Sequence, residues 1–293
     1  SEIIIFLILI SDLSIDIKVY IDFISILKSE IRIKKIIFNL DEFNLNQLKK
    51  LSLSYFKPSN ITSLLNNKVK EGTFKTEIEA YLDKENNLDN FIAKGSVSNF
   101  KLEIKNNLQF ANSSFDFFAD KSDILLKNIF GDIGPIKISE GDVKAIFSKE
   151  ISIESNFKSK INYNKNNDNY IGFDIDFKNT KNLESFIAEL NNSFSINFDK
   201  TYKLLNYKFK NTGKITKAKF NFENSLENLF NNEKKNFISL SNSEIKTDIN
   251  KEKNILSLFG KYSINGGNFL SFDLKNIFSK NLSNVKLNAE YDR

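Results

Sequence analysis

The sequence predicts a mainly β protein built from antiparallel strands, with only a few short helices. Apolar and polar residues alternate over many short stretches, which is the pattern of strands with one buried and one exposed face. Segments rich in Asn, Asp, Lys and Gly separate these stretches, and strands joined by short turns pair antiparallel. Only two prolines, Pro58 and Pro135, occur in 293 residues. Little therefore interrupts a ladder of backbone hydrogen bonds.

The chain begins with apolar segments that we interpret as strands. Ile3–Ile10 is the longest apolar run, and it is too short for a membrane-spanning helix, which needs about 20 residues. A buried strand is the better interpretation. Ile15–Ile21 then alternates apolar and polar residues. Ile31–Leu40 does the same, with a shift of one residue at Lys35 that indicates a β-bulge.

Four segments show helical spacing instead. We expect short helices at Asn44–Leu53 and at Ser59–Asn67, the second of which follows Pro58. Later in the chain, Asn182–Asn191 and Asn224–Asn232 carry apolar residues at the spacing of one helix face. All four segments are short, so they leave the fold class unchanged.

From Gly72 onward, strand signals recur at short intervals. Asn265–Asn268, with the sequence Asn-Gly-Gly-Asn between apolar flanks, predicts a hairpin turn. Lys94–Val97 and Thr212–Ile215 each contain a glycine that we expect to begin a strand, so the sheet would grow hairpin by hairpin. The clearest alternating stretches are Phe100–Ile104, Ile151–Phe157, Ile161–Tyr163, Ile171–Phe177, Phe194–Phe198, Ala218–Phe222, Ile245–Ile249 and Val285–Tyr291.

The residue types that are missing exclude several kinds of chemistry. The chain has no His, Cys, Met or Trp, so it lacks the commonest general base, the thiol nucleophile and the usual zinc ligands. Asp174 and Asp176 share one face of an expected strand, but no third ligand accompanies them, and we interpret them as solvated. We therefore expect no catalytic residues, no metal and no cofactor. Carboxylates, Lys, Ser and Tyr leave catalysis possible in principle, and an enzyme is the least favoured class.

The charge pattern argues against a nucleic-acid partner. The formal net charge is +5, and it is carried almost wholly by lysine, because arginine occurs only at Arg32 and Arg293. Acidic residues are interspersed with the lysines, which favours a solvated mixed-charge surface. The chain begins at Ser1 and contains no Met. We interpret it as an interior or processed piece of a longer protein.

Several segments in the first half carry a family pattern. Asp12–Ile17 and Leu27–Ile36 form a strand, a turn and a second strand, and Phe43–Leu48 has the position of a following short helix. Lys70–Phe74 and Ala93–Phe100 have the form of recurrent strands led by glycine. In these segments the chain resembles the AsmA-like superfamily of envelope proteins, including its TamB-like and YhdP-like branches. The second half resembles the family by its β-pattern only.

The resemblance implies a fold and a role. It implies one continuous segment over residues 1–293, with initial strands and a short helix at 1–57 and repeated hairpins over 58–293. The long antiparallel sheet would twist and curl into an open groove, apolar inside and polar outside. Such proteins are expected in the periplasm of the cell envelope, anchored to the inner membrane by an upstream helix. They would pass phospholipids between the inner and outer membranes, with phospholipid acyl chains as the partners in the groove.

In such a groove, an acyl chain would gain by lying along a row of apolar side chains, since apolar burial stabilises by roughly 25 cal/mol per Å². The alternation alone fits two other structures. One is a dry-cored sandwich in a structural or adhesive surface protein, and the other is an outer-membrane β-barrel. Only the resemblance favours the open groove. The candidate lipid-contacting residues are Phe100, Leu102, Ile104, Ile171, Phe173, Ile175, Phe177, Phe220 and Phe222.

Overall fold

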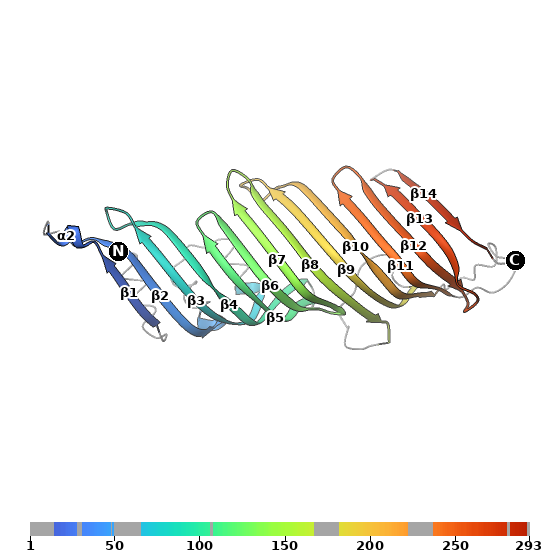
Figure 1. Cartoon of the computed structure of the whole chain (residues 1–293), viewed down its shortest axis with the longest axis horizontal. Helices are drawn as coiled ribbons and strands as arrows, with labels where there is room; N and C mark the ends of the chain where they lie inside the picture. The colour runs from blue at the N-terminus through green and yellow to red at the C-terminus, as the bar shows by residue number, and fades with distance from the viewer. Residues whose placement is uncertain are drawn as a thin grey trace. The chain divides into compact units, whose positions relative to one another are not determined.

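A computed structural model describes residues 15–27, 31–47, 49, 66–105, 108–166, 182–221, 237–279 and 282–291. It confirms the predicted fold class: fourteen strands form one antiparallel sheet in which each strand lies beside its neighbours in sequence (Figure 1). The strands are β1 Ile15–Ile21, β2 Ile33–Asn44, β3 Val69–Leu82, β4 Leu88–Lys105, β5 Leu108–Asp120, β6 Asp123–Ile133, β7 Ile136–Phe147, β8 Ile151–Asn164, β9 Leu183–Phe198, β10 Leu204–Asn221, β11 Phe237–Asn250, β12 Asn254–Ile264, β13 Leu270–Phe278 and β14 Ser283–Ala289.

The chain divides into two compact units. Unit 1 comprises residues 1–131 and 142–148, and unit 2 comprises residues 132–141 and 149–293. Unit 1 therefore contains β1 to β5 and unit 2 contains β8 to β14, while β6 and β7 contribute residues to both. Each unit has its own cluster of buried apolar side chains.

The strands of unit 1 follow the alternation in the sequence. In β2, Phe38 is 3% exposed, and it pairs with Ile17 of β1 and Ile78 of β3. These three side chains share one face because residues directly opposite each other in a ladder point to the same side. The irregularity expected at Lys35 is also present, since Lys35 pairs with Tyr20 whereas the next pair skips a residue of β2.

The hairpin turn predicted at Asn265–Asn268 is confirmed. Asn265 and Gly266 both have positive φ, at 51° and 76°. The N–H of Gly267 donates to the carbonyl oxygen of Ile264 at 3.0 Å. Two successive residues with positive φ define a type I′ turn, whose twist matches that of the flanking strands.

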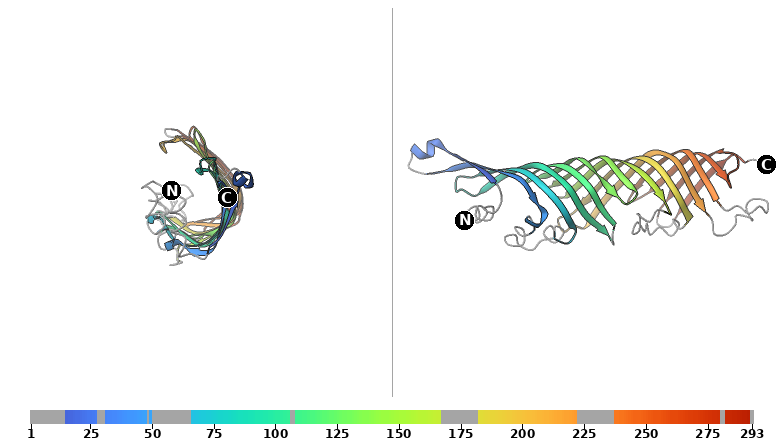
Figure 2. Two further views of the ribbon diagram at one scale, coloured as in Figure 1. Left: turned by 90° about the vertical axis from the view of Figure 1, so that its left-hand side faces the viewer. Right: turned by 90° about the horizontal axis from the view of Figure 1, so that it is seen from below.

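Asparagine occupies the left-handed conformation within four strands. Asn99, Asn112, Asn128 and Asn242 have φ of 51°, 49°, 53° and 47°. The ladder skips residues at Asn99, between β4 and β5, and at Asn242, between β11 and β12. Asparagine tolerates this conformation better than other residues with a Cβ, and bulges bend a strand. In each unit, the strands curve along their length (Figure 2).

Two glycines lie in the middle of strands, and the expectation that they begin strands was wrong. Gly95 lies within β4 and Gly213 within β10. A Cβ at Gly95 would lie 2.0 Å from the carbonyl oxygen of Lys75, and one at Gly213 would lie 2.1 Å from that of Glu189. Glycine is therefore needed at both positions because the neighbouring backbone approaches too closely for any side chain.

The helix expected at Asn182–Asn191 was also wrong, because residues 183–198 form β9. Phe186, Ala188 and Leu190 alternate with polar or exposed residues and pair with β8 and β10 along the whole segment. Ile187, which completed the helical pattern, is 39% exposed on the opposite face. Pairing on both sides of the strand overrode a local spacing that fits either structure.

Of the three other expected helices, the structure describes two in part. Residues 45–47 and 49 are helical within Asn44–Leu53, as are residues 66–67 within Ser59–Asn67. The expected helix Asn224–Asn232 and the expected strand Ile3–Ile10 lie outside the described residues. A five-residue helix that the sequence pattern did not predict, α2 Phe23–Leu27, connects β1 to β2.

Candidate functional site

The side of unit 1 that carries its buried cluster is called here the apolar face of unit 1. It continues from strand to strand, since Ile78 of β3 pairs with Ala93 of β4, which pairs with Ala119 of β5. Phe43 and Phe74 stack with ring centroids 5.4 Å apart. The cluster consists of Ile36, Phe38, Leu40, Phe43 and Leu82, with Ile15, Ile33, Phe74, Ile78 and Ala80 packed against it.

Two of the candidate residues, Phe100 and Leu102, lie together on this face. The ring of Phe100 packs edge-on against Phe115, with centroids 5.2 Å apart. Leu102 pairs with Val69 of β3 and with Phe110 of β5. The third candidate in this stretch, Ile104, lies at a shift in register between β4 and β5 and is 43% exposed.

Unit 2 has a corresponding surface, called here the apolar face of unit 2. Four of its members are buried, among them Ile215 at 2% exposed, whereas the other side chains of the cluster, including its phenylalanines, are only partly buried. The candidate Phe220 belongs to it and pairs with Ile238 of β11. The described elements of unit 2 are strands that contact their neighbours in the sheet, and no described helix packs on this face. The cluster comprises Ala188, Ile215, Ala218 and Leu240, with Phe186, Leu190, Phe220, Ile238, Ile245, Leu258, Tyr262 and Phe272 against it.

The remaining candidates, Ile171, Phe173, Ile175, Phe177 and Phe222, lie outside the described residues.

Several residues of the two apolar faces were missed by the sequence analysis. Phe117 of β5, Phe186 of β9 and Leu258 of β12 are all paired with residues of these faces. The alternation of Phe115 and Phe117 with polar Asp116 could have identified the first of these. Phe186 was hidden because it had been assigned to a helix.

Buried serines lie where strands approach most closely. Ser113 in unit 1 and Ser243 in unit 2 are 1% and 0% exposed. The Ser113 hydroxyl donates to the carbonyl oxygen of Phe100 at 2.7 Å. A Cβ at Gly260 would lie 2.3 Å from the Ser243 hydroxyl oxygen. Small residues thus occupy points on the apolar faces that have no room for larger ones.

A short polar row crosses the apolar face of unit 2. Asn211 donates through Nδ2 to Oδ1 of Asn192 at 2.7 Å, and Asn192 donates through Nδ2 to the hydroxyl of Ser159 at 3.0 Å. All three side chains are buried. A shift in strand register would separate these buried groups from their partners, so the row favours one register of β8, β9 and β10.

The opposite face of unit 1 is charged. Lys35 of β2 and Glu79 of β3 form an ion pair at 3.0 Å, and the hydroxyl of Tyr81 donates to the same carboxylate at 2.8 Å. The ladder continues to β4, where Lys94 pairs with Glu77 at 2.6 Å. This side is therefore suited to water while the other side is suited to apolar contacts.

The contacts in this ladder stabilise the charged forms of its members. The hydrogen bond from Lys35 is the largest effect on Glu79 and, with that from Tyr81, holds the pKa of the carboxyl below its usual value. The same hydrogen bond raises the pKa of Lys35. The hydrogen bond to Glu79 raises the pKa of the Tyr81 phenol, because ionisation would remove the donated proton.

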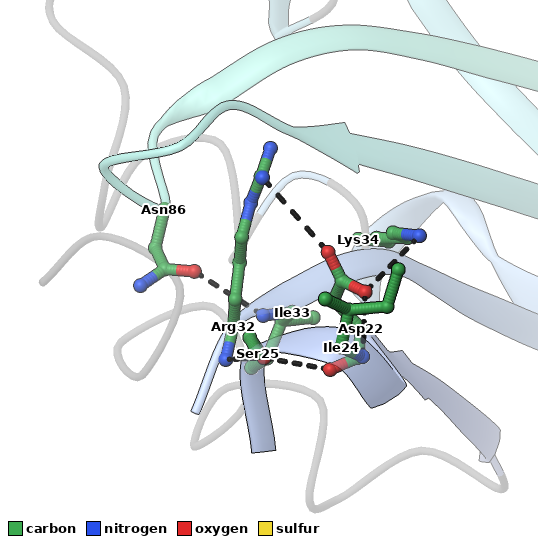
Figure 3. A network of polar contacts seen from close by, with 7 residues as sticks. All are labelled: Asp22, Ile24, Ser25, Arg32, Ile33, Lys34 and Asn86. Carbon is green, nitrogen blue, oxygen red and sulfur yellow. Dashed lines mark hydrogen bonds and ion pairs between the residues drawn. The ribbon is translucent and has the colours of Figure 1, made fainter. Parts of the chain in front are cut away.

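A polar network holds the connection between β1 and β2 (Figure 3). The N–H of Asp22 donates to the carbonyl oxygen of Arg32 at 2.8 Å, and the N–H of Arg32 donates to the hydroxyl of Ser25 at 3.1 Å. Lys34 lies 3.3 Å from the Asp22 carboxylate. Burial opposes ionisation of Asp22, but the hydrogen bond from Ile24 and the charges of Lys34 and Arg32 outweigh it, so the pKa is lowered.

Comparisons with known proteins give no relative for this chain: no family model, no curated protein and no solved structure matches it. Within the described ranges, no cluster of three or more acidic residues is placed to hold a metal ion. The helices in the same ranges are all too short or too polar to cross a membrane.

Proposed function

We propose that this chain handles phospholipid acyl chains by sheltering them from water along the apolar faces of its sheet, without making or breaking a bond. The observation that carries the proposal is the division of the sheet into two unlike faces. In unit 1, one face presents apolar side chains from β1 to β5, and the other carries the Lys–Glu ladder.

The size and exposure of the side chains support a lipid guest. In unit 2, Phe186, Leu258 and Phe272 are large and only partly buried, on a face where no described helix lies. Each Å² of alkyl chain that leaves water for such a surface gains roughly 25 cal/mol. Contact along several strands would therefore hold an acyl chain without any directional bond. The acyl chain could then slide along the sheet.

The likeness of the first half to AsmA-like envelope proteins supports a place for this activity. We propose that the chain belongs to that superfamily and acts in the periplasm between inner and outer membranes. The sheet would then form a bridge between the two membranes, and phospholipids would pass along it. The water-compatible charged face would point away from the guest.

Adjacent phenylalanines on β5 provide a matched test of this proposal. Phe117 pairs with Gly95 on the apolar face, whereas Phe118 pairs with Lys94 on the charged face. Phe117→Asp places a charge among the proposed acyl contacts, and Phe118→Asp makes the same chemical change on the other side. The purified chain is expected to carry phospholipid, which lipid extraction and mass spectrometry would detect. We expect the amount to fall severalfold in Phe117→Asp and to stay unchanged in Phe118→Asp.

Equal lipid in both variants, with both folded by circular dichroism, would show that the apolar face of unit 1 is not the binding surface. An intact chain free of lipid after gentle extraction from a membrane-containing lysate would count against the proposed function as a whole.

A structural role is the second candidate, and one observation favours it. Ile36 and Phe38 in β2 are 2% and 3% exposed, and Leu45, in the helical stretch after β2, is 2% exposed. This part of unit 1 is therefore packed like the core of a structural or adhesive surface protein. The lipid measurement separates the two functions, since a dry-cored protein would carry no lipid and both aspartate variants would behave alike.

A further inference from the structure

An exposed apolar surface lies at the connection between β1 and β2. It is formed by Phe23, Ile24, Ile26 and Leu27 of α2 together with Ile31, and we call it the α2 knob. Their exposed fractions are 73%, 64%, 49%, 76% and 77%. Side chains of this size are normally buried, and a contiguous exposed group of them marks an interaction surface. In Figure 1, α2 projects from the ends of β1 and β2.

Hydrogen bonds hold the α2 knob in place. Ser25, the buried residue of α2, donates through its hydroxyl to the carbonyl oxygen of Asp22 at 2.6 Å, and the N–H of Ile24 donates to the Asp22 carboxylate at 3.1 Å. The N–H of Ile33 donates to Oδ1 of Asn86 in the turn between β3 and β4 at 3.3 Å (Figure 3). These bonds fix α2 with its apolar side chains outward, so their exposure is a feature of the fold.

The area of the knob distinguishes between possible occupants. Five large apolar side chains exposed to this extent present on the order of 600 Å², less than the ~800 Å² per partner that a stable protein–protein interface buries. An area of this size is sufficient for a peripheral contact with a bilayer, in which apolar side chains enter the region between head groups and acyl chains.

The charges beside the knob also indicate which kind of partner it binds. Arg32 and Lys34 are matched by the carboxylates of Asp22 and Asp83, both of which have lowered pKa values. Among the described residues beside the knob the charges are therefore balanced, and a balanced set has no strong preference for an anionic or a cationic partner. Apolar insertion is therefore the main attraction available to this surface.

The knob is continuous with the apolar face of unit 1. Ile21, Val19 and Ile17 of β1 are 47%, 51% and 38% exposed and pair with Ile33, Ile36 and Phe38 on that face. We propose that the α2 knob inserts into the surface of a phospholipid bilayer and is the point at which unit 1 meets the membrane. The continuity argument rests on the proposed function, whereas the exposure, bracing and area do not.

The absence of tryptophan from the chain makes a direct test possible. Phe23→Trp places a single indole on the knob, and Phe259→Trp places one on β12, where Phe259 is 48% exposed on the side opposite the apolar face of unit 2. With vesicles of phosphatidylcholine, the emission of the Phe23→Trp variant should shift to shorter wavelength and be quenched by brominated phosphatidylcholine. The Phe259→Trp variant should show neither effect.

Flotation of the full chain with the same vesicles supplies the second measurement. The unmodified chain should float with pure phosphatidylcholine, and added phosphatidylglycerol should change the bound fraction little. The double substitution Phe23→Asn with Leu27→Asn should lower the partition coefficient by at least about tenfold. The matched control, Ile187→Asn with Phe259→Asn on the opposite face of unit 2, should leave it unchanged.

Three results would overturn the inference. They are no flotation of the unmodified chain, binding that requires phosphatidylglycerol, and equal losses in the two double variants. If circular dichroism shows that the knob double variant does not fold, the emission of the Phe23→Trp variant still tests whether the knob enters the bilayer. A knob variant that still carries copurified phospholipid but no longer floats would separate this inference from the proposed function, because only membrane contact would be lost.

Discussion

At the scale of single residues, glycine and serine control how closely neighbouring backbones approach on the apolar faces. Gly95 and Gly213 allow contacts that any Cβ would prevent, and Ser243 packs beside Gly260 in the same way. Glycine within a strand costs conformational entropy and leaves no side chain to pack. Its presence in mid-strand therefore indicates that close approach and strand curvature outweigh that cost.

We expect Gly95→Ala to destabilise unit 1. The new methyl group would meet the carbonyl oxygen of Lys75, a backbone atom that cannot move without displacing β3. Overpacking of this kind costs about 1–3 kcal/mol, and urea unfolding followed by circular dichroism would measure it. Gly72→Ala is the matched control, since its Cβ would lie 3.2 Å from the ring of Phe74, which can adjust. Equal stability of the two variants would contradict the proposed role of Gly95.

At the scale of elements, the charged ladder links β2, β3 and β4 on the side opposite the apolar face. Lys35 and Glu79 are the best-connected pair, and Tyr81 adds a hydrogen bond to the same carboxylate. The hydrogen bond between them lowers the pKa of Glu79 and raises the pKa of Lys35, so each partner favours the charged form of the other. The ladder therefore stabilises these strands when both groups are charged.

This gives a prediction for acid unfolding. A carboxyl whose pKa is lower in the folded state stabilises the fold above its unfolded pKa, and this stabilisation is lost as the pH falls through the folded value. Glu79→Gln should therefore reduce the loss of stability between about pH 7 and about pH 3.5, measured as the shift of the urea midpoint. Glu71→Gln, which removes a more exposed pair with Lys101, should leave that loss unchanged. A Glu79→Gln chain that remains as acid-sensitive as the unmodified protein would refute the role of this ladder.

The elements also show what sequence patterns can and cannot predict. The two-residue alternation predicted the antiparallel sheet, and Asn-Gly predicted the turn at Asn265–Asn268, because both signals are local. Local spacing failed at Phe186 and Ile187, where a helix and a strand both fit and pairing with β8 and β10 decided the outcome. Gly95 was misplaced for a similar reason, since the backbone that requires glycine there belongs to another strand.

The candidate site was also predictable where it depends on local alternation and not where it depends on strand register. Alternation correctly grouped Phe100 and Leu102 on one side of β4, whereas Ile104 lies at a shift in register. The neighbours that complete the face, such as Phe110 and Phe115, depend on register, which bulges at Asn99 and Asn112 alter. A single sequence does not reveal such shifts. The α2 knob was missed because exposed apolar residues in a short connection have the same composition as buried ones.

At the scale of the whole molecule, stability is distributed along the sheet. The contacts between described elements join strands that are neighbours in sequence, and each unit has its own apolar cluster. In a repetitive sheet of this kind, as in repeat proteins, stability approximates a sum of local terms and nearest-neighbour terms. Loss of packing in one unit should therefore remain within that unit.

Amide hydrogen exchange would test this locality. Phe38→Ala removes a ring that is 3% exposed in the cluster of unit 1, and such truncations cost about 3–5 kcal/mol. We expect amides of β1, β2 and β3 to lose protection while those of β10, β11 and β12 keep theirs. Leu240→Ala in the cluster of unit 2 should give the reverse pattern. Because each substitution serves as the control for the other, loss of protection throughout both units from either one would show that the sheet unfolds as a single cooperative structure.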